Sequence, residues 1–183
     1  MDTRKYRGMR SILKAATALV RTGWMLRGVP PAIGETVADH SFAAALIALE
    51  LGFRLQREGF NVDPYRAASI ALVHDIGETI IGDIPRVSGI SRREKAFAEA
   101  RAVESLEIDS NIKDLYREFE EGRTLEARVA RLSELLSTYL RGLEYEKLGY
   151  DVKDIINNMK NEVLEIAERL GVKEYVNDML EHS

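Results

Sequence analysis

The sequence predicts an all-α fold in a single domain spanning residues 1–183, and three observations support this. The chain contains only four prolines, the residue that helix interiors tolerate least. The rest is rich in Ala, Leu, Glu, Arg and Lys, which are good helix formers. No strand-like alternation persists beyond a few positions. With 45% hydrophobic residues, a chain of 183 residues can bury one sizeable core.

We expect about seven helices, separated by glycine and proline residues. Residues 11–20 show apolar side chains at helical spacing behind Ser11, which can cap the helix. Residues 28–35 contain two prolines and two glycines and predict a loop. Residues 39–59 are apolar on most faces, so they predict a long central helix that ends at Gly59.

Residues 63–81 predict one continuous helix with a clear start. Asp63 can accept hydrogen bonds from the first turn, and Pro64 suits the first helical position because that position needs no amide. The stop is expected at residues 82–85. Further helical segments are predicted at 91–107, 111–122, 124–149, 152–171 and 173–182. We expect those after residue 150 to pack on a core formed by about residues 8–150.

Composition and charge exclude several classes of protein. The chain has no cysteine, so disulfides, iron–sulfur clusters and thiolate zinc sites are excluded. Its net charge of −4 offers no overall attraction to nucleic acid or anionic lipid, so we expect neither as a partner. No apolar run approaches the ~20 residues that span a bilayer, and the charged N-terminus lacks the apolar core of a signal peptide. A cytoplasmic location is therefore expected.

Two of the three histidines lie in apolar segments beside an aspartate. His40 follows Asp39, and Asp75 follows His74. A buried carboxylate next to an imidazole needs a compensating charge, and a metal ion suits both kinds of ligand. His40 alone is equally well explained as a satisfied core histidine, and a lone histidine–aspartate pair is weak evidence, but the joint pattern favours a metal site. His182 is expected to be a solvated residue of the tail.

The spacing of the acidic residues around His74 favours one shared site. His74 and Asp75 point about 100° apart on a helix, so they can share an ion only if it lies beside the helix. His40 would supply a third ligand from the neighbouring helix. Glu78 follows the pair by four and three residues and lies on the same face. Asp83 lies just past the expected helix end, where a loop can turn it toward the site.

Four stretches of the sequence together resemble the HD-domain metal-dependent phosphohydrolases, and among these the 5′-deoxynucleotidase branch. They read RTGWMLRGV, ETVADHSF, ALVHDIGETIIGDIP and EARVARLSELLSTYLRGLEYE, in the order and spacing of that family. The resemblance covers about residues 8–150. It implies a single-domain HD-domain helical bundle, a homodimer and one divalent metal ion, with Mn, Co, Ni, Fe, Zn and Mg as candidates.

The resemblance also implies four protein ligands for that ion. His40 matches the first histidine of the family, and His74 and Asp75 match its histidine–aspartate pair. An ungapped reading puts Glu134 where the family has an aspartate. The longer Glu134 side chain could still reach the ion, could weaken the site, or could leave the position to water. Glu35, ahead of His40, matches a further family position behind the ligands.

Five more residues take their expected roles from the same resemblance. Glu78 is expected to orient or deprotonate the attacking water, and Asp83 to protonate the 5′-oxygen, although the two roles could be exchanged. Arg21 is expected to bind the phosphate through its forked donors. Lys95 is a candidate second phosphate contact. Trp24 matches a residue beside the sugar, or it belongs to the core or the rim.

The expected activity is removal of the 5′-phosphate from ribo- or deoxyribonucleoside monophosphates, so the expected partner is a small-molecule nucleotide. Two alternatives stay open. An HD phosphohydrolase could act on a cyclic nucleotide, a guanosine polyphosphate or a nucleoside triphosphate, although residues 91–95 form the only dense basic cluster near the motif. A non-catalytic nucleotide-binding module would result if the site were degraded at Glu134, but the intact Glu78 and Asp83 argue against this.

Overall fold

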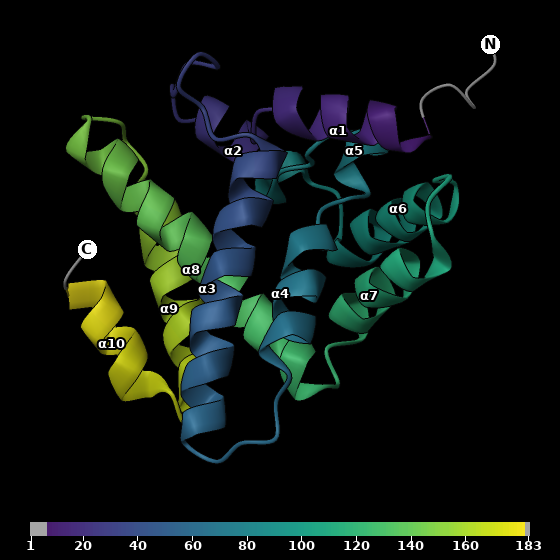
Figure 1. Cartoon of the computed structure of the whole chain (residues 1–183). Helices are drawn as coiled ribbons and strands as arrows, with labels where there is room; N and C mark the ends of the chain where they lie inside the picture. The colour runs from purple at the N-terminus through teal and green to yellow at the C-terminus, as the bar shows by residue number, and fades with distance from the viewer. Residues whose placement is uncertain (1–6, 182–183) are drawn as a thin grey trace, which may run out of the picture.

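The computed structural model of the chain describes residues 7–181, and helices joined by loops make up this range (Figure 1). His182 lies outside the described residues. The elements follow in the order α1 (Met9–Ala18), α2 (Thr22–Met25), α3 (Val37–Arg57), α4 (Pro64–Val73), α5 (Glu78–Ile81), the 3-10 helix η2 (Arg86–Ser88), α6 (Arg92–Glu104), α7 (Ser110–Glu121), α8 (Leu125–Lys147), α9 (Lys153–Leu170) and α10 (Lys173–Glu181). Extended pairing within the described range is limited to two isolated bridges. The all-α prediction is confirmed.

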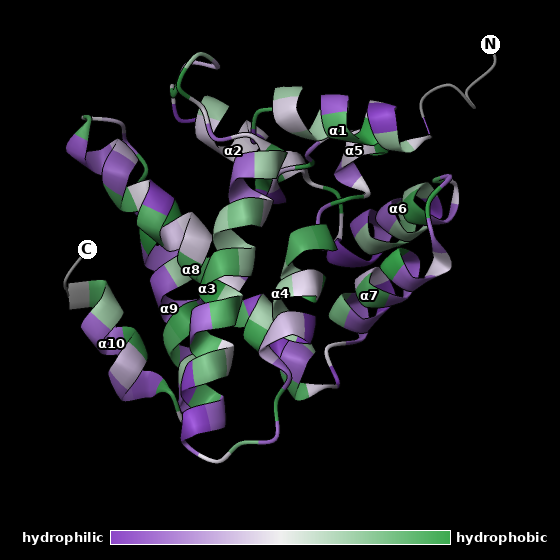
Figure 2. Ribbon diagram, in the orientation of Figure 1, coloured by the Kyte–Doolittle hydropathy of each residue, from purple (hydrophilic) through white to green (hydrophobic). Residues whose placement is uncertain are grey.

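Helices α3, α4 and α8 pack together at the centre of the molecule (Figure 1). Their fully buried side chains include Leu51, Ile70, Leu132 and Leu136. Apolar residues mark α3 and α8 in Figure 2, whereas hydrophilic residues are frequent on the outer helices α6 and α10. Helix α9 packs along α8, and α6 and α7 lie on the other side, next to α5 and α4. Across the described residues we find no helix with the length and apolar character that a bilayer span requires.

The prediction of one helix over residues 63–81 is wrong, because the chain forms two helices there. The start is as expected: Asp63 Oδ1 accepts hydrogen bonds from two amides of the first turn, and Pro64 occupies the first helical position. However, α4 ends at Val73, and α5 begins only at Glu78.

A side chain contributes to the break between α4 and α5. Nδ1 of His74 donates to the Ala71 carbonyl at 2.7 Å, which is the acceptor that a continuing α-helix would use for the amide of Asp75. The following amides form tighter turns, and Ile76 donates to the carbonyl of Val73, three residues back. The break therefore falls at the His74–Asp75 pair.

The segment between α1 and α3 contains a short helix and a bridge that the sequence did not predict. Val20 and Thr36 form an antiparallel bridge, and the amide of Arg21 donates to the Glu35 carbonyl at 2.9 Å. Thr36 caps α3, which therefore begins at Val37, two residues before its predicted start. The bridge places Arg21 and Glu35 next to the first turn of α3.

The late helices pack on the rest of the molecule. Ile156 and Val163 of α9 are buried, so these two residues pack internally. Gly142 allows α8 and α9 to approach closely, since a Cβ there would lie 2.8 Å from Cγ1 of Ile156.

Gly52 sets the approach of α3 to α4, and we predict that Gly52→Ala destabilises the fold. A Cβ at this position would lie 2.8 Å from the Cα of Pro64, and backbone cannot swing aside. Overpacking costs roughly 1–3 kcal/mol, and the better helix propensity of Ala offsets up to about 1 kcal/mol. The free energy of unfolding, measured by urea denaturation, should fall by about 1–2 kcal/mol. Gln56→Ala, at an exposed position of the same helix, is the control, and equal stability of the two variants would contradict the close approach.

Candidate metal centre and cleft

Side chains from three helices converge on one point of the bundle. His40 lies in the first turn of α3, His74 at the end of α4, and Glu134 within α8. One ligand atom from each of these residues lies within 4.8 Å of the others. Oδ2 of Asp75 lies 3.1 Å from Nε2 of His74 and 3.8 Å from Nε2 of His40. The fold thus gathers the four residues that were expected to act as metal ligands.

The two imidazoles turn their Nε2 atoms toward each other at a separation of 3.2 Å. Because Nδ1 of His74 donates to a backbone carbonyl, the neutral ring carries a lone pair on Nε2. Nδ1 of His40 lies 3.3 Å from Oγ of Ser137 and 3.8 Å from Oε1 of Glu35. With its proton on the side of that carboxylate, the neutral His40 ring also presents a lone pair at Nε2.

The donor set fits a divalent metal ion. Two lone pairs and a carboxylate repel one another, and a cation between them removes the repulsion. Metal-binding histidines usually have their other ring nitrogen held by a hydrogen bond, often to a carbonyl. The Ala71 carbonyl holds His74 in this way, and the Ser137 hydroxyl lies within hydrogen-bond distance of Nδ1 of His40. Imidazole nitrogens combined with carboxylates suit Mn, Fe, Co, Ni and Zn.

The ionisation of the cluster agrees with this fit. Burial and the charges of Arg21 and His74 lower the pKa of His40 well below its ordinary value. Burial alone would raise the pKa of Asp75, but His74 and Arg21 hold it well below its usual range. Burial opposes the charge of His74 too, yet the neighbouring Asp75 raises the pKa of that imidazole. The carboxylate therefore attracts positive charge to the point where the ligands meet.

Arg21 is a charged neighbour of the cluster. Its Nη1 donates to Oδ2 of Asp75 at 2.9 Å, and its Nε lies 4.0 Å from Oε2 of Glu35. Burial opposes the charge, but these two carboxylates raise the pKa of Arg21 above its ordinary value. Only 19% of the side chain is exposed. A guanidinium fixed in this way can offer its remaining donors to a phosphate.

A cleft of about 620 Å³ lies beside the cluster, a volume typical of small-molecule sites. It is lined by eight of the nine residues to which the sequence assigned a role: Arg21, Trp24, His74, Asp75, Glu78, Asp83, Lys95 and Glu134. The ninth, His40, is completely buried and faces the cluster through Nε2.

Glu78 is a buried carboxyl group with one free oxygen. Nζ of Lys95 lies 3.3 Å from its Oε1 and 3.4 Å from Oε1 of Glu99. Oε2 of Glu78 has no hydrogen-bond partner among the described residues. Burial, followed by the charge of Asp75, raises the pKa of Glu78 to about 9. The group therefore holds a proton at neutral pH in this arrangement of charges.

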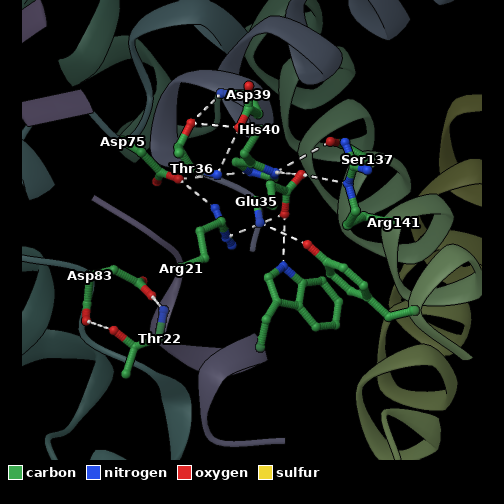
Figure 3. A network of polar contacts seen from close by, with 12 residues as sticks. Arg21, Thr22, Glu35, Thr36, Asp39, His40, Asp75, Asp83, Ser137 and Arg141 are labelled. Atoms are coloured by element: carbon green, nitrogen blue, oxygen red, sulfur yellow. Dashed lines mark hydrogen bonds and ion pairs between the residues drawn. The ribbon is translucent and has the colours of Figure 1, made fainter. Parts of the chain in front are cut away.

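Asp83 reaches the cleft through the loop after α5, as the sequence predicts. Gly82 has a φ of 83°, which permits the sharp turn there. Oδ2 of Asp83 accepts from the amide of Thr22, and its carbonyl accepts from Oγ1 of Thr22 at 2.9 Å (Figure 3). These two contacts fix the loop to the start of α2.

Glu35 connects several residues behind the cluster (Figure 3). Nε1 of Trp24 donates to its Oε2 at 2.8 Å, and Nε of Arg141 lies 3.7 Å from its Oε1. The Glu35 amide donates to the hydroxyl of Tyr145 at 2.7 Å. Trp24 itself is only 2% exposed and meets Tyr145 edge-on. Trp24 is thus a core residue that also lines the cleft.

Sequence reasoning missed two residues of this region. Nη1 of Arg131 donates to Oε1 of Glu134 at 3.2 Å, and its guanidinium lies 3.8 Å from the ring centroid of Phe119. The three-residue spacing of Arg131 and Glu134 on a helix could have indicated this pair. Tyr145 gave no such signal, because its partner Glu35 lies 110 residues away in the sequence.

Comparisons with known proteins agree with this picture. A family model for the HD domain matches residues 17–170. A curated relative from Dictyostelium discoideum, 5′-deoxynucleotidase HDDC2, is 30% identical over 75% of this chain and 76% of its own length. The protein of the same name from Xenopus laevis is 33% identical over 70% of this chain and 63% of its own length, so the match spans less than two thirds of that relative.

Solved structures resemble the whole described fold. A protein from Pyrococcus horikoshii OT3 has a TM-score of 0.77 and 32% identity, with 93% of this chain and 94% of that chain covered. A conserved hypothetical protein from Pyrococcus furiosus has a TM-score of 0.75 and 30% identity, with 94% and 97% covered. The family model spans all four candidate ligands. The chain therefore belongs to the HD-domain family.

Proposed function

We propose that this protein is a metal-dependent phosphohydrolase that removes the 5′-phosphate from nucleoside monophosphates, deoxyribonucleotides among them. The observation that carries the proposal is the convergence of His40, His74 and Asp75 beside Arg21 at the edge of one cleft, which all but the buried His40 line. The relatives named 5′-deoxynucleotidase support the substrate class.

We assign His40, His74, Asp75 and Glu134 as the residues that hold the metal ion. Glu134 takes the place of the aspartate that the family resemblance led us to expect, and its position within 4.8 Å of both imidazole nitrogens supports a ligand role. When bound, a divalent cation supplies positive charge for the phosphoryl oxygens and lowers the pKa of a bound water. The two imidazoles favour Mn, Fe, Co, Ni or Zn over Mg.

Arg21 binds the phosphate of the substrate in this proposal. Its Nη1 is occupied by Asp75, which leaves Nη2 as a donor aimed from a fixed guanidinium. Lys95 is a weaker candidate, because Glu78 and Glu99 already engage its ammonium group. In hydrolysis a water oxygen forms a bond to phosphorus, the bond from phosphorus to O5′ breaks, and O5′ takes up a proton.

Glu78 and Asp83 carry the proton transfers. The raised pKa of Glu78 makes it the better donor of a proton to O5′. Asp83, held by Thr22, is then left to orient the attacking water or take its proton. These roles are the reverse of the first expectation from the sequence, which gave the water to Glu78 and the 5′-oxygen to Asp83 but left the exchange open.

The metal assignment predicts separate effects for two ligands. Asp75→Ala should reduce both the metal content and phosphate release to background. Glu134→Ala should lower metal affinity at least about tenfold, the lower end of the effect of losing a residue that only supports a ligand. The metal affinity of Glu134→Asp should fall between that of Glu134→Ala and that of the wild type. Elemental analysis of the purified proteins measures the content. The control is Glu146→Ala, which changes a glutamate of α8 outside the cleft. Unchanged metal content in both Glu134 variants would remove Glu134 from the ligand set.

The proton-transfer assignment predicts that Glu78→Gln keeps its metal and loses turnover. The amide has nearly the same size but cannot give up a proton to O5′, and such groups contribute about 10²- to 10⁴-fold to the rate. Phosphate release from deoxynucleoside monophosphates with Mn, Co, Ni, Zn or Mg measures kcat. Glu104→Gln, an exposed glutamate paired with Arg117, should match the wild type. Full activity of Glu78→Gln would remove Glu78 from the mechanism.

We also propose a homodimer formed through α3 and α4. Phe42 and Leu46 lie one turn apart on α3 with 67% and 56% exposure, and Tyr65 and Leu72 on α4 are 68% and 55% exposed. Exposed large apolar side chains on two helices that pack together favour association. Leu46→Glu should convert the dimer to a monomer in light scattering without altering the circular dichroism spectrum. A wild-type protein that is monomeric at all concentrations would contradict the proposal.

A further inference from the structure

One wall of the cleft is a single stripe of α9. Ile155, Asn158, Met159 and Glu162 all line it, and their spacing places them on one face of the helix. Ile155 is half-buried and Met159 buried, whereas Asn158 is exposed. The stripe is therefore an apolar surface with one free amide group at its middle. Neither the metal assignment nor the proton transfers use these residues.

Two ion pairs hold this wall in position. Asp154, at the start of α9, pairs with Arg27 from the segment after α2. Glu162, two turns further along, pairs with Arg86 from the loop after α5. Both carboxylates are thus neutralised by cations that also line the cleft. The wall offers no free positive charge between them, so it suits an uncharged group rather than a second phosphate.

The start of the stripe, around Ile155, lies far along α8 from Glu134, whereas its later residues run back toward the metal ligands. Along α8, Thr138 and Gly142 follow Glu134 by four and eight residues, which is about 6 and 12 Å. Gly142 meets both Trp24 and Ile156 of α9. Since α8 and α9 are joined by a short turn and run antiparallel, the segment around Ile155 lies near the far end of this span.

We propose that Ile155, Asn158 and Met159 form the subsite that binds the nucleobase. The proposal rests on the proposed function, because it takes the phosphate to be bound at Arg21. The sugar then lies near Trp24, and the uncharged, planar base faces the α9 stripe. Ile155 and Met159 contact the ring, while the Asn158 amide donates to or accepts from the base edge.

The experiment compares substrates with and without a base. Steady-state kinetics are measured on the metal-loaded enzyme with the four common deoxynucleoside monophosphates and with 2-deoxyribose 5-phosphate, which has the same phosphoester but no base. The variants are Asn158→Ala, Ile155→Ala and the control Asn157→Ala. Asn157 is the adjacent asparagine of α9; it is also exposed, and it does not line the cleft.

Asn158→Ala should raise KM for nucleotides about 3- to 10-fold, the size of one lost hydrogen bond. Its kcat should stay within about twofold, and its kinetics on 2-deoxyribose 5-phosphate should not change. Ile155→Ala should raise KM most for purine nucleotides, which have the larger ring. Asn157→Ala should match the wild type with every substrate.

Two results would overturn the subsite. One is an Asn158→Ala effect that is equal for nucleotides and for the substrate without a base. The other is an effect no larger than that of Asn157→Ala. If the wild type releases phosphate from no substrate, the proposed function fails separately. Calorimetric titration of the metal-loaded proteins with dAMP and with 2-deoxyribose 5-phosphate then tests the subsite. The subsite predicts weaker dAMP binding in Asn158→Ala and Ile155→Ala than in the wild type and Asn157→Ala, and equal binding of 2-deoxyribose 5-phosphate in all four proteins.

Discussion

The repulsion between three electron-rich atoms is the constraint on which the site depends. Nε2 of His40, Nε2 of His74 and Oδ2 of Asp75 lie within 3.8 Å of one another in a buried environment. An arrangement of this kind stays unfavourable unless positive charge enters it. Arg21 supplies part of that charge from one side, and a divalent cation would supply the rest. The surrounding fold is organised to hold these atoms in place despite their repulsion.

Each repelling group is held by a partner on its outer side. The Ala71 carbonyl holds the ring of His74, and this bond competes with the next amide of a continuing α4. Glu35 lies behind His40 and is itself held by Trp24 and Tyr145. The break between α4 and α5, which contradicts the simplest helical reading, is thus part of the site. A continuous helix would have required the Ala71 carbonyl for its own ladder.

The sequence was sufficient to predict those features of the fold and site that depend on local residue patterns. Helix spacing predicted the long helices, and the acids that follow His74 predicted which side chains share a cleft. It could not predict the bond from His74 to Ala71, because side-chain competition for a backbone carbonyl leaves no periodic trace. Nor could it predict the contact of Tyr145 with Glu35, since only the assembled bundle brings residues so distant in sequence together. Glu134 was identified through resemblance, and its neighbour Arg131 through the structure.

The two ends of the cleft are lined by side chains of different character. At one end, Arg21, Asp75 and Glu78 are partly or fully buried titratable groups whose pKa values depend on one another. At the other, the charges of α9 are already neutralised by Arg27 and Arg86, and apolar side chains fill the space between them. A ligand that matches this cleft has a doubly negative group at one end and an uncharged, flat group at the other. A nucleoside monophosphate has that form, with its phosphate beside Arg21 and its base against the α9 stripe.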